Sequence, residues 1–332
     1  MEIKKLNTLR GVAVFIVMLS HYSNSSNLFS GFLGHGAGKL GVMIFFLLSG
    51  FLMSFLYIHK KFETFEVSNY LIARFARVAP LFIILIIASY TLQQMGFSFL
   101  YNIPTIEELF SHLLLLYGSS VLWTIPSEIQ FYFIFLFLWW CWSKKESYFY
   151  AAVLVIFTIL SFFNFPVFEG FFYKLHYKFT IFETLPYFLM GALFGILYKR
   201  WKAPASLIHP LYLLSFLLII LLYPKIYFFL FGLKYYAWHD LSILFMISEV
   251  FFVLLFLVPD NNIFLSNKIG DFFGKISYSL YLLHLPILLS IKHYAIDEPI
   301  VYFFIFLFLS LFTAYLSYLF IEKPLRSKIR RR

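Results

Sequence analysis

Residues 9–21 read LRGVAVFIVMLSH, an apolar stretch with a cation near one end and an imidazole at the other. If this stretch is helical, Arg10 and His21 lie on one face about three turns apart, separated by roughly 16 Å along the axis. Val14 and Val17 lie between them on that face. Ionisable groups are costly inside a membrane segment, and those that occur there are usually functional. The pattern therefore predicts one group that holds an anion near a membrane surface and another that does proton chemistry deeper in the membrane.

The rest of the chain has the composition of an integral membrane protein. Of its 332 residues, 62% are hydrophobic and 13% are charged, and the mean hydropathy is +0.85. Apolar runs of spanning length recur and predict an all-α, polytopic transmembrane helical bundle that forms a single domain, residues 1–332. The predicted spans are about 9–23, 39–59, 79–96, 126–142, 148–164, 180–199, 207–223, 238–258, 277–294 and 299–321. The shorter apolar run 106–117 is expected to form an interfacial or re-entrant helix.

The loop charges give this bundle an orientation. With both termini in the cytoplasm, 20 of the 26 Lys and Arg residues fall inside. The outer segments hold Lys39, Lys174, Lys178, Lys225, Lys234 and Lys292. This asymmetry predicts a multi-pass protein of the cell membrane, in bacteria the cytoplasmic membrane. It also accounts for the net charge of +10 without a nucleic-acid partner, and the basic C-terminal segment is expected to contact anionic lipids.

Several chemistries are not predicted by this sequence. The single cysteine, Cys141, excludes an intrachain disulfide and a cysteine-based metal site. We find no P-loop, HExxH or GxSxG motif in the sequence. We therefore expect neither a metal nor a bound cofactor, and no ATPase, metalloprotease or serine hydrolase activity.

Two motifs lie close to the start of the second and third spans. The block GVMIFFLLSGFLMS, residues 41–54, contains Gly41 and Gly50, which permit close helix approach, and Ser49, which can bond to a neighbouring backbone. The block RFARVAP, residues 74–80, places Arg74 and Arg77 three residues apart on one helical face. Two guanidinium groups on the cytoplasmic side are suited to phosphate oxygens, and the alternative is a simple cluster of topology anchors.

The block LWTIPSEIQFYF, residues 122–133, carries Trp123, Glu128 and Tyr132. In the predicted topology Glu128 and His21 both lie near the outer ends of their spans. A carboxylate that reached the imidazole would orient it and stabilise the imidazolium, which would make His21 a better base. The alternative is an exposed interfacial glutamate.

The block SYSLYLLHLP, residues 277–286, places Ser277, Tyr281 and His284 on one stripe of the ninth span. Two interpretations stay open for these side chains. They either bond to one another as an interior polar network, or they form a wall of a substrate or donor path.

Together with the terminal Glu322-Lys323-Pro324, these blocks resemble the integral-membrane acyltransferase family 3 in order and spacing, from Leu6 to Pro324. The resemblance implies O-acylation, usually O-acetylation, of extracytoplasmic carbohydrate with cytoplasmic acetyl-CoA as the donor. Arg10 and His21 match the first-span pair of that family, and Arg74 and Arg77 match its arginine pair. The sequence ends at Arg332 without an SGNH hydrolase-like domain, so it resembles the stand-alone type.

The residues and the resemblance lead to one expected mechanism. Arg10, Arg74 and Arg77 bind the donor phosphates, and His21, supported by Glu128, is the catalytic base or the acyl carrier. We expect the substrate or donor path to be lined by Trp123, Tyr132, Ser277, Tyr281 and His284. The expected acceptor is a surface glycan or a lipid-linked oligosaccharide. Two alternatives are the same chemistry on a small secreted glycosylated metabolite, and a transporter or flippase for a lipid-linked sugar without catalysis. The acceptor hydroxyl, the acyl chain and the oligomeric state are not predicted.

Overall fold

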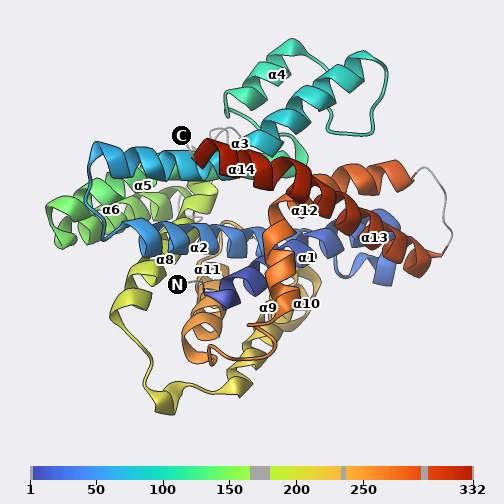
Figure 1. Cartoon of the computed structure of the whole chain (residues 1–332). Coiled ribbons are helices and arrows are strands. Elements are labelled where there is room, and N and C mark those ends of the chain that lie inside the picture. The colour runs from blue at the N-terminus through green and yellow to red at the C-terminus, as the bar shows by residue number, and fades with distance from the viewer. Residues whose placement is uncertain (1–2, 165–179, 233–236, 293–297, 331–332) are drawn as a thin grey trace.

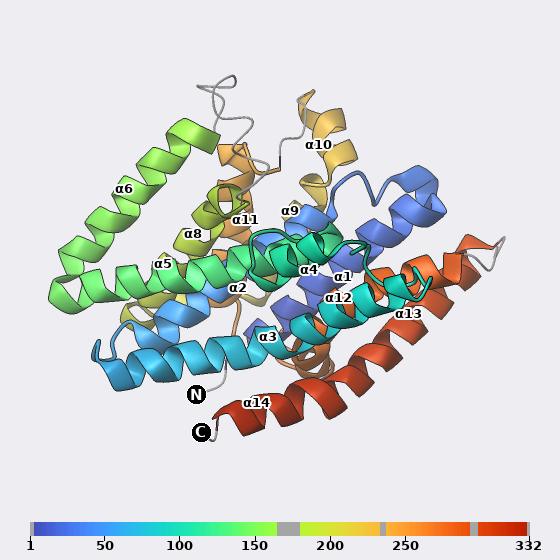
Figure 2. The same cartoon turned by 90° about the horizontal axis from the view of Figure 1, so that it is seen from above.

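The computed structural model describes residues 3–164, 180–232, 237–292 and 298–330, and within these ranges every regular element is helical. The N-terminal half contains α1 (Lys4–Ser26), α2 (Gly38–Tyr57), α3 (Thr64–Gln94), α4 (Ile106–Leu113), α5 (Thr124–Lys144) and α6 (Glu146–Asn164). The C-terminal half contains α8 (Ile181–Arg200), α9 (Phe216–Leu221), α10 (Pro224–Phe231), α11 (Leu241–Phe252), α12 (Lys268–Lys292), α13 (Pro299–Ser317) and α14 (Lys323–Arg330). Figures 1 and 2 show α6 at one margin of the bundle and α13 at the opposite margin, with α1, α2 and α12 between them.

Each predicted span overlaps a helix, but fewer than ten helices meet the criteria for crossing a membrane. Among the described residues, six helices are long and apolar enough, and a seventh span results if one bent helix pair is counted as a span. That pair, Pro210–Leu221 and Pro224–Phe231, is bent by 85°, and only its first helix falls within the span predicted for 207–223. The bend falls where Pro224 begins α10, because proline has no backbone N–H to continue the preceding helix. These helices identify a multi-pass membrane protein, while the count of ten and the cytoplasmic termini stay predictions.

Helix α1 differs from a simple apolar span because a charged side chain is buried at its start. The helix begins with Lys4 and Lys5, and the side chain of Lys5 is buried inside the protein. Its ammonium group forms an ion pair with Asp260 at 2.9 Å and donates to the backbone oxygens of Leu255 and Val258. A buried cation is tolerated because these partners replace water, and the contact ties the start of α1 to the segment after α11.

Helix α4 has only eight residues and lies beside the second half of α3, outside the main bundle (Figure 1). The buried His112 holds it in place. The backbone N–H of Ser119 donates to Nε2 of His112 at 3.0 Å, so Nε2 is unprotonated and Nδ1 donates to the carbonyl of Glu108 at 2.7 Å. Burial lowers the pKa of His112, so the folded segment favours the neutral imidazole. The short helix agrees with the expectation that 106–117 does not form a span.

Glycines allow the central helices to approach one another closely. A Cβ atom at Gly50 of α2 would lie 2.0 Å from the backbone oxygen of Phe188, and one at Gly191 of α8 would lie 2.1 Å from that of Leu47. A Cβ at Gly41 would lie 2.3 Å from the backbone oxygen of Ala13 in α1. These contacts explain why small residues occur in an otherwise bulky, aromatic sequence. They confirm the close packing predicted for Gly41 and Gly50.

Candidate functional site

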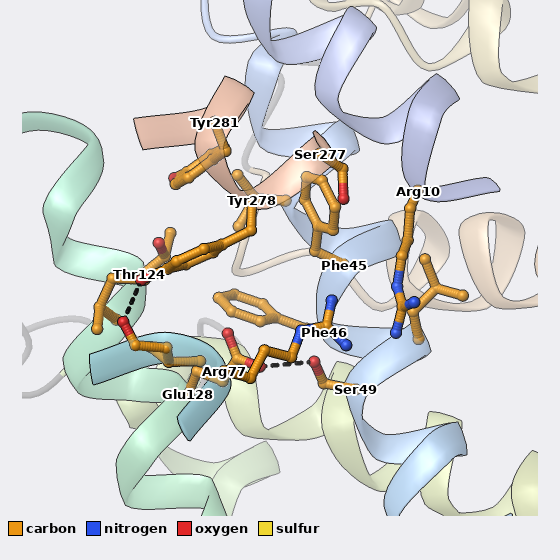
Figure 3. A pocket seen from close by; sticks show the side chains of 14 residues that line it. Arg10, Phe45, Phe46, Ser49, Arg77, Thr124, Glu128, Ser277, Tyr278 and Tyr281 are labelled. Carbon is orange, nitrogen blue, oxygen red and sulfur yellow. Dashed lines mark hydrogen bonds between the residues drawn. The ribbon is translucent and has the colours of Figure 1, made fainter. Parts of the chain in front are cut away.

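A pocket that is partly open to solvent lies where five helices meet, and we call it the arginine cavity. It is bounded by α1, α2, α3, α5 and α12, and its polar lining residues include Arg10, Ser49, Arg77, Glu128, Tyr278 and Tyr281. Figure 3 shows the guanidinium groups of Arg10 and Arg77 pointing into this space from opposite sides. Two cations and one carboxylate face it, so the cavity is suited to an anion with several oxygens.

Glu128 is held by neutral donors in this cavity. One carboxylate oxygen accepts a hydrogen bond from the hydroxyl of Ser49 at 3.0 Å and another from Tyr132 at 2.9 Å (Figure 3 shows the bond to Ser49). Among the described residues, no hydrogen bond or ion pair joins Glu128 to His21. The predicted support of His21 by Glu128 is therefore not a direct contact in this structure. Glu128 instead links α2 to α5 beside the two arginines.

The structure separates the two arginines of the RFARVAP block. Arg77 lines the arginine cavity with Arg10, whereas Arg74 lies with its guanidinium carbon 5.5 Å from the ring centroid of Tyr57. That position gives Arg74 a cation–π contact within the protein. The pair of guanidinium groups facing one space is thus Arg10 and Arg77, which are far apart in sequence, rather than Arg74 and Arg77.

A second pocket, also partly open to solvent, contains His21, and we call it the histidine cavity. Its lining residues include His21, Asn24, Lys39, Trp123, Glu183 and Trp238. The indole rings of Trp123 and Trp238 are in edge-to-face contact, with centroids 5.7 Å apart. The cavity thus combines an aromatic wall with groups that can donate or accept hydrogen bonds, as carbohydrate-sized polar ligands require.

Tyr281 and Val42 line both cavities and form their common wall. The hydroxyl of Tyr281 donates to the backbone oxygen of Val121 at 3.0 Å, in the short helix Ser120–Trp123 that precedes α5. This bond connects α12 to the segment that carries Trp123. Because Tyr281 and Val42 line both spaces, the arginine cavity and the cavity that contains His21 are neighbours.

His21 is half-buried, and its ring contacts the fully buried ring of His284 on α12. The ring centroids are 5.2 Å apart and the planes form an angle of 73°. The residue next to His21 is therefore another imidazole rather than a carboxylate. Of the other predicted path residues, Tyr132, Ser277 and Tyr281 are buried and Trp123 is half-buried. Ser277 lines the arginine cavity and donates to the backbone oxygen of Gly274 at 2.9 Å, and Tyr132 donates to Glu128.

Sequence reasoning did not identify several of these residues as parts of a site. Ser49 was assigned a packing role, yet its hydroxyl holds Glu128. Trp238 and Glu183 belong to none of the sequence motifs described above. The signal available in the sequence was their position, because Trp238 lies just before α11 and Glu183 lies in the first turn of α8. Among the described residues, no group of three or more His, Cys, Asp or Glu side chains could hold a metal ion.

Comparison with known proteins assigns the chain to a family. The sequence profile of an acyltransferase domain matches residues 3–319. Proteins of Staphylococcus aureus strains COL, MSSA476 and MRSA252, named as predicted O-acetyltransferases, are 26% identical to it over 360 aligned positions. These alignments cover 97% of this chain but only 57% of each relative, and no solved structure matches the chain at a significant level. Since the profile covers nearly the whole sequence, the chain belongs to the acyltransferase 3 family.

Proposed function

We propose that the protein is a membrane O-acyltransferase, most simply an O-acetyltransferase, that uses cytoplasmic acyl-CoA. The acceptor in this proposal is a hydroxyl group of a cell-surface or lipid-linked polysaccharide. One observation carries the proposal: Arg10 and His21, on the single helix α1, open into two cavities that share Tyr281 and Val42 as a wall. A cationic donor site and a base thus lie in two neighbouring cavities, as transfer between two bound substrates requires.

The donor is assigned to the arginine cavity. Arg10 and Arg77 supply charge-assisted hydrogen bonds to the phosphates of the CoA moiety, and the planar guanidinium group can contact two oxygens at once. The acyl-pantetheine arm extends past Tyr281 toward the histidine cavity. Glu128 limits the excess positive charge of this site when the donor is absent.

The acceptor is assigned to the histidine cavity. The flat faces of Trp123 and Trp238 suit the apolar face of a sugar ring, while Asn24 and Lys39 suit its hydroxyl groups. Nothing in this assignment fixes the acceptor sugar or the position of the hydroxyl group. We place this cavity toward the outer face of the cell membrane, following the topology predicted from the charges.

The reaction then needs one base that also acts as an acid. His21 removes the proton from the acceptor hydroxyl as its oxygen attacks the thioester carbonyl carbon. A C–O bond forms, the C–S bond breaks, and the CoA thiolate leaves and receives the proton from the His21 imidazolium. The products are the O-acyl glycan and free CoA.

The test uses source cells that lack the gene and carry either the wild-type protein or His21→Ala. Ester-linked acetate on the envelope glycan is measured by mass spectrometry and normalised to folded protein from gel filtration in detergent. Loss of a general base predicts a decrease of about 10²–10⁴-fold. His209→Ala, an exposed histidine outside both cavities, is the matched control and should retain full acetylation.

Three results would contradict the proposal, each in its own way. Normal acetylation per folded His21→Ala molecule would remove His21 from the mechanism. Glycan that is missing from the surface, rather than present without acetate, would indicate a transporter. Acetate found on a secreted metabolite and not on the envelope would change the acceptor.

A further inference from the structure

Among the described residues, His284 alone has a ring in contact with the ring of His21, and its side chain is completely buried in α12. Its surroundings determine where its proton lies. Nδ1 is 2.8 Å from the backbone oxygen of Tyr281 and 3.1 Å from that of Leu280. A carbonyl oxygen can only accept a hydrogen bond, so Nδ1 carries the proton and Nε2 has a free lone pair.

That lone pair has no partner among the described residues. Nε2 of His284 is inaccessible to solvent and accepts no hydrogen bond. Buried polar atoms are nearly always paired, and an unpaired one is costly, so such an atom in a helix interior calls for an explanation. The neighbouring ring of His21, with its centroid 5.2 Å from that of His284, carries a group that could donate to it, since a neutral imidazole has one N–H.

We propose that Nε2 of His284 accepts the ring N–H of His21 during the reaction and thereby selects the tautomer of His21. In that tautomer the other nitrogen of His21 has its lone pair free to face the histidine cavity, where a base is required. His284 is thus a positioning residue. The proposal rests on the proposed function, and it replaces the predicted orienting carboxylate of Glu128 with a second histidine.

The same contact serves both halves of proton transfer. When His21 takes the acceptor proton, the imidazolium keeps its N–H directed at Nε2 of His284. The hydrogen bond strengthens because the donor is now charged. When the proton passes to the CoA thiolate, the original tautomer is restored. His284 itself neither gains nor loses a proton, because its Nδ1–H stays bonded to the two carbonyls. Catalytic hydrogen bonds of this kind are often longer in the absence of substrate, which agrees with a ring contact that is not yet a hydrogen bond.

The first test measures the tautomer of His21 directly and does not depend on activity. Wild-type protein labelled with ¹⁵N-histidine is placed in lipid vesicles with acetyl-CoA, and His21 is assigned by the signal that is lost in His21→Gln. We expect one neutral tautomer of His21 in the wild type and a mixture of both in His284→Leu. A mixture in the wild type, or an unchanged single tautomer in His284→Leu, would overturn the proposal.

The second test uses transfer of radiolabelled acetyl groups from acetyl-CoA to glycan in membranes from cells that lack the gene. His284→Leu should lower the rate at saturating acetyl-CoA by about 10²-fold, the lower part of the range for general base catalysis. The KM for acetyl-CoA should not change, because Arg10 and Arg77 are untouched. His284→Gln, whose amide oxygen can still accept a hydrogen bond, should recover part of the rate.

A purely structural histidine gives a different pattern. It predicts that His284→Leu lowers the amount of folded protein while each folded molecule keeps the wild-type rate, and this result would refute the positioning role. If the wild-type protein transfers no acetyl group at all, the proposed function fails. The NMR measurement would still decide whether His284 selects the tautomer of His21.

Discussion

Arg77 and Arg74 form a natural pair of variants, because they are identical side chains three residues apart whose surroundings differ. Arg77 lines the arginine cavity, and a hydrogen bond from its guanidinium to a phosphate is worth about 1.5–3 kcal/mol. Arg77→Gln should therefore raise the Kd for acetyl-CoA by about 10- to 150-fold. Arg74 lies over the ring of Tyr57 instead, so Arg74→Gln should leave the Kd nearly unchanged and lower stability by about 0.5–2 kcal/mol.

Calorimetric titration of the purified proteins with acetyl-CoA, together with thermal unfolding, measures both effects. S-acetylpantetheine carries no phosphate and provides the control ligand, which Arg77→Gln and the wild type should bind equally. The reasoning is refuted if Arg74→Gln weakens acetyl-CoA binding as much as Arg77→Gln does while the melting temperature is unchanged. A loss of affinity for S-acetylpantetheine in Arg77→Gln would also refute it, because the phosphates would then not be the groups that Arg77 binds.

Three other predictions follow from local geometry. Glu128→Gln replaces a charged acceptor of the hydrogen bonds from Ser49 and Tyr132 with a neutral one, at a cost of about 1 kcal/mol for each bond. The melting temperature should therefore fall, while calorimetry should show no increase in the Kd for acetyl-CoA. Gly50→Ala should lower the free energy of unfolding by about 1–3 kcal/mol, measured by chemical unfolding, because α2 and α8 must separate to admit the added methyl group. Gly38→Ala on the same helix is the control and should not change the free energy of unfolding, because its Cβ would make only ordinary van der Waals contacts. Burial lowers the pKa of His112 in the folded protein, so below about pH 6.5 the unfolded segment around α4 binds a proton more readily than the folded one does. The protection of the amides of residues 106–120 from hydrogen exchange should therefore decrease as the pH falls. His112→Leu should abolish this pH dependence.

The helices and their glycine contacts could be predicted because they depend on local pattern. Apolar runs bounded by charges mark the helices, and a glycine inside such a run marks a place where another backbone approaches, as Gly50 does with Phe188. The predicted span 207–223 ends just before Pro224, so it did not include the apolar helix Pro224–Phe231 that follows the bend. Of the lysines assigned to the outer segments, Lys174, Lys178 and Lys234 lie outside the described residues.

The partners within the site could not be predicted, because they depend on how each helix is rotated about its axis. Positions three apart on a helix differ by about 60° in direction, which is enough for one arginine to face a cavity and the other to face Tyr57. The same applies to the start of α5. Trp123 lines the histidine cavity, whereas Glu128, five residues later, lines the arginine cavity. Depth in the membrane suggested that Glu128 and His21 meet, but depth alone does not determine which face of a helix is turned toward a neighbour.

The contact between α1 and α12 shows how sequence nevertheless fixes the register of the site. A Cβ at Gly274 would lie 2.5 Å from the Cα of Asn7, and one at Gly11 would lie 2.8 Å from the Cβ of Phe273, so the absence of a side chain at these two positions permits the close approach in this alignment. From that contact both helices extend past the arginine cavity to the His21–His284 pair. A slip of one turn would move His284 by about 5.4 Å along the axis and remove it from the ring of His21. The glycines that pack the bundle therefore also determine which imidazole stands next to the proposed base.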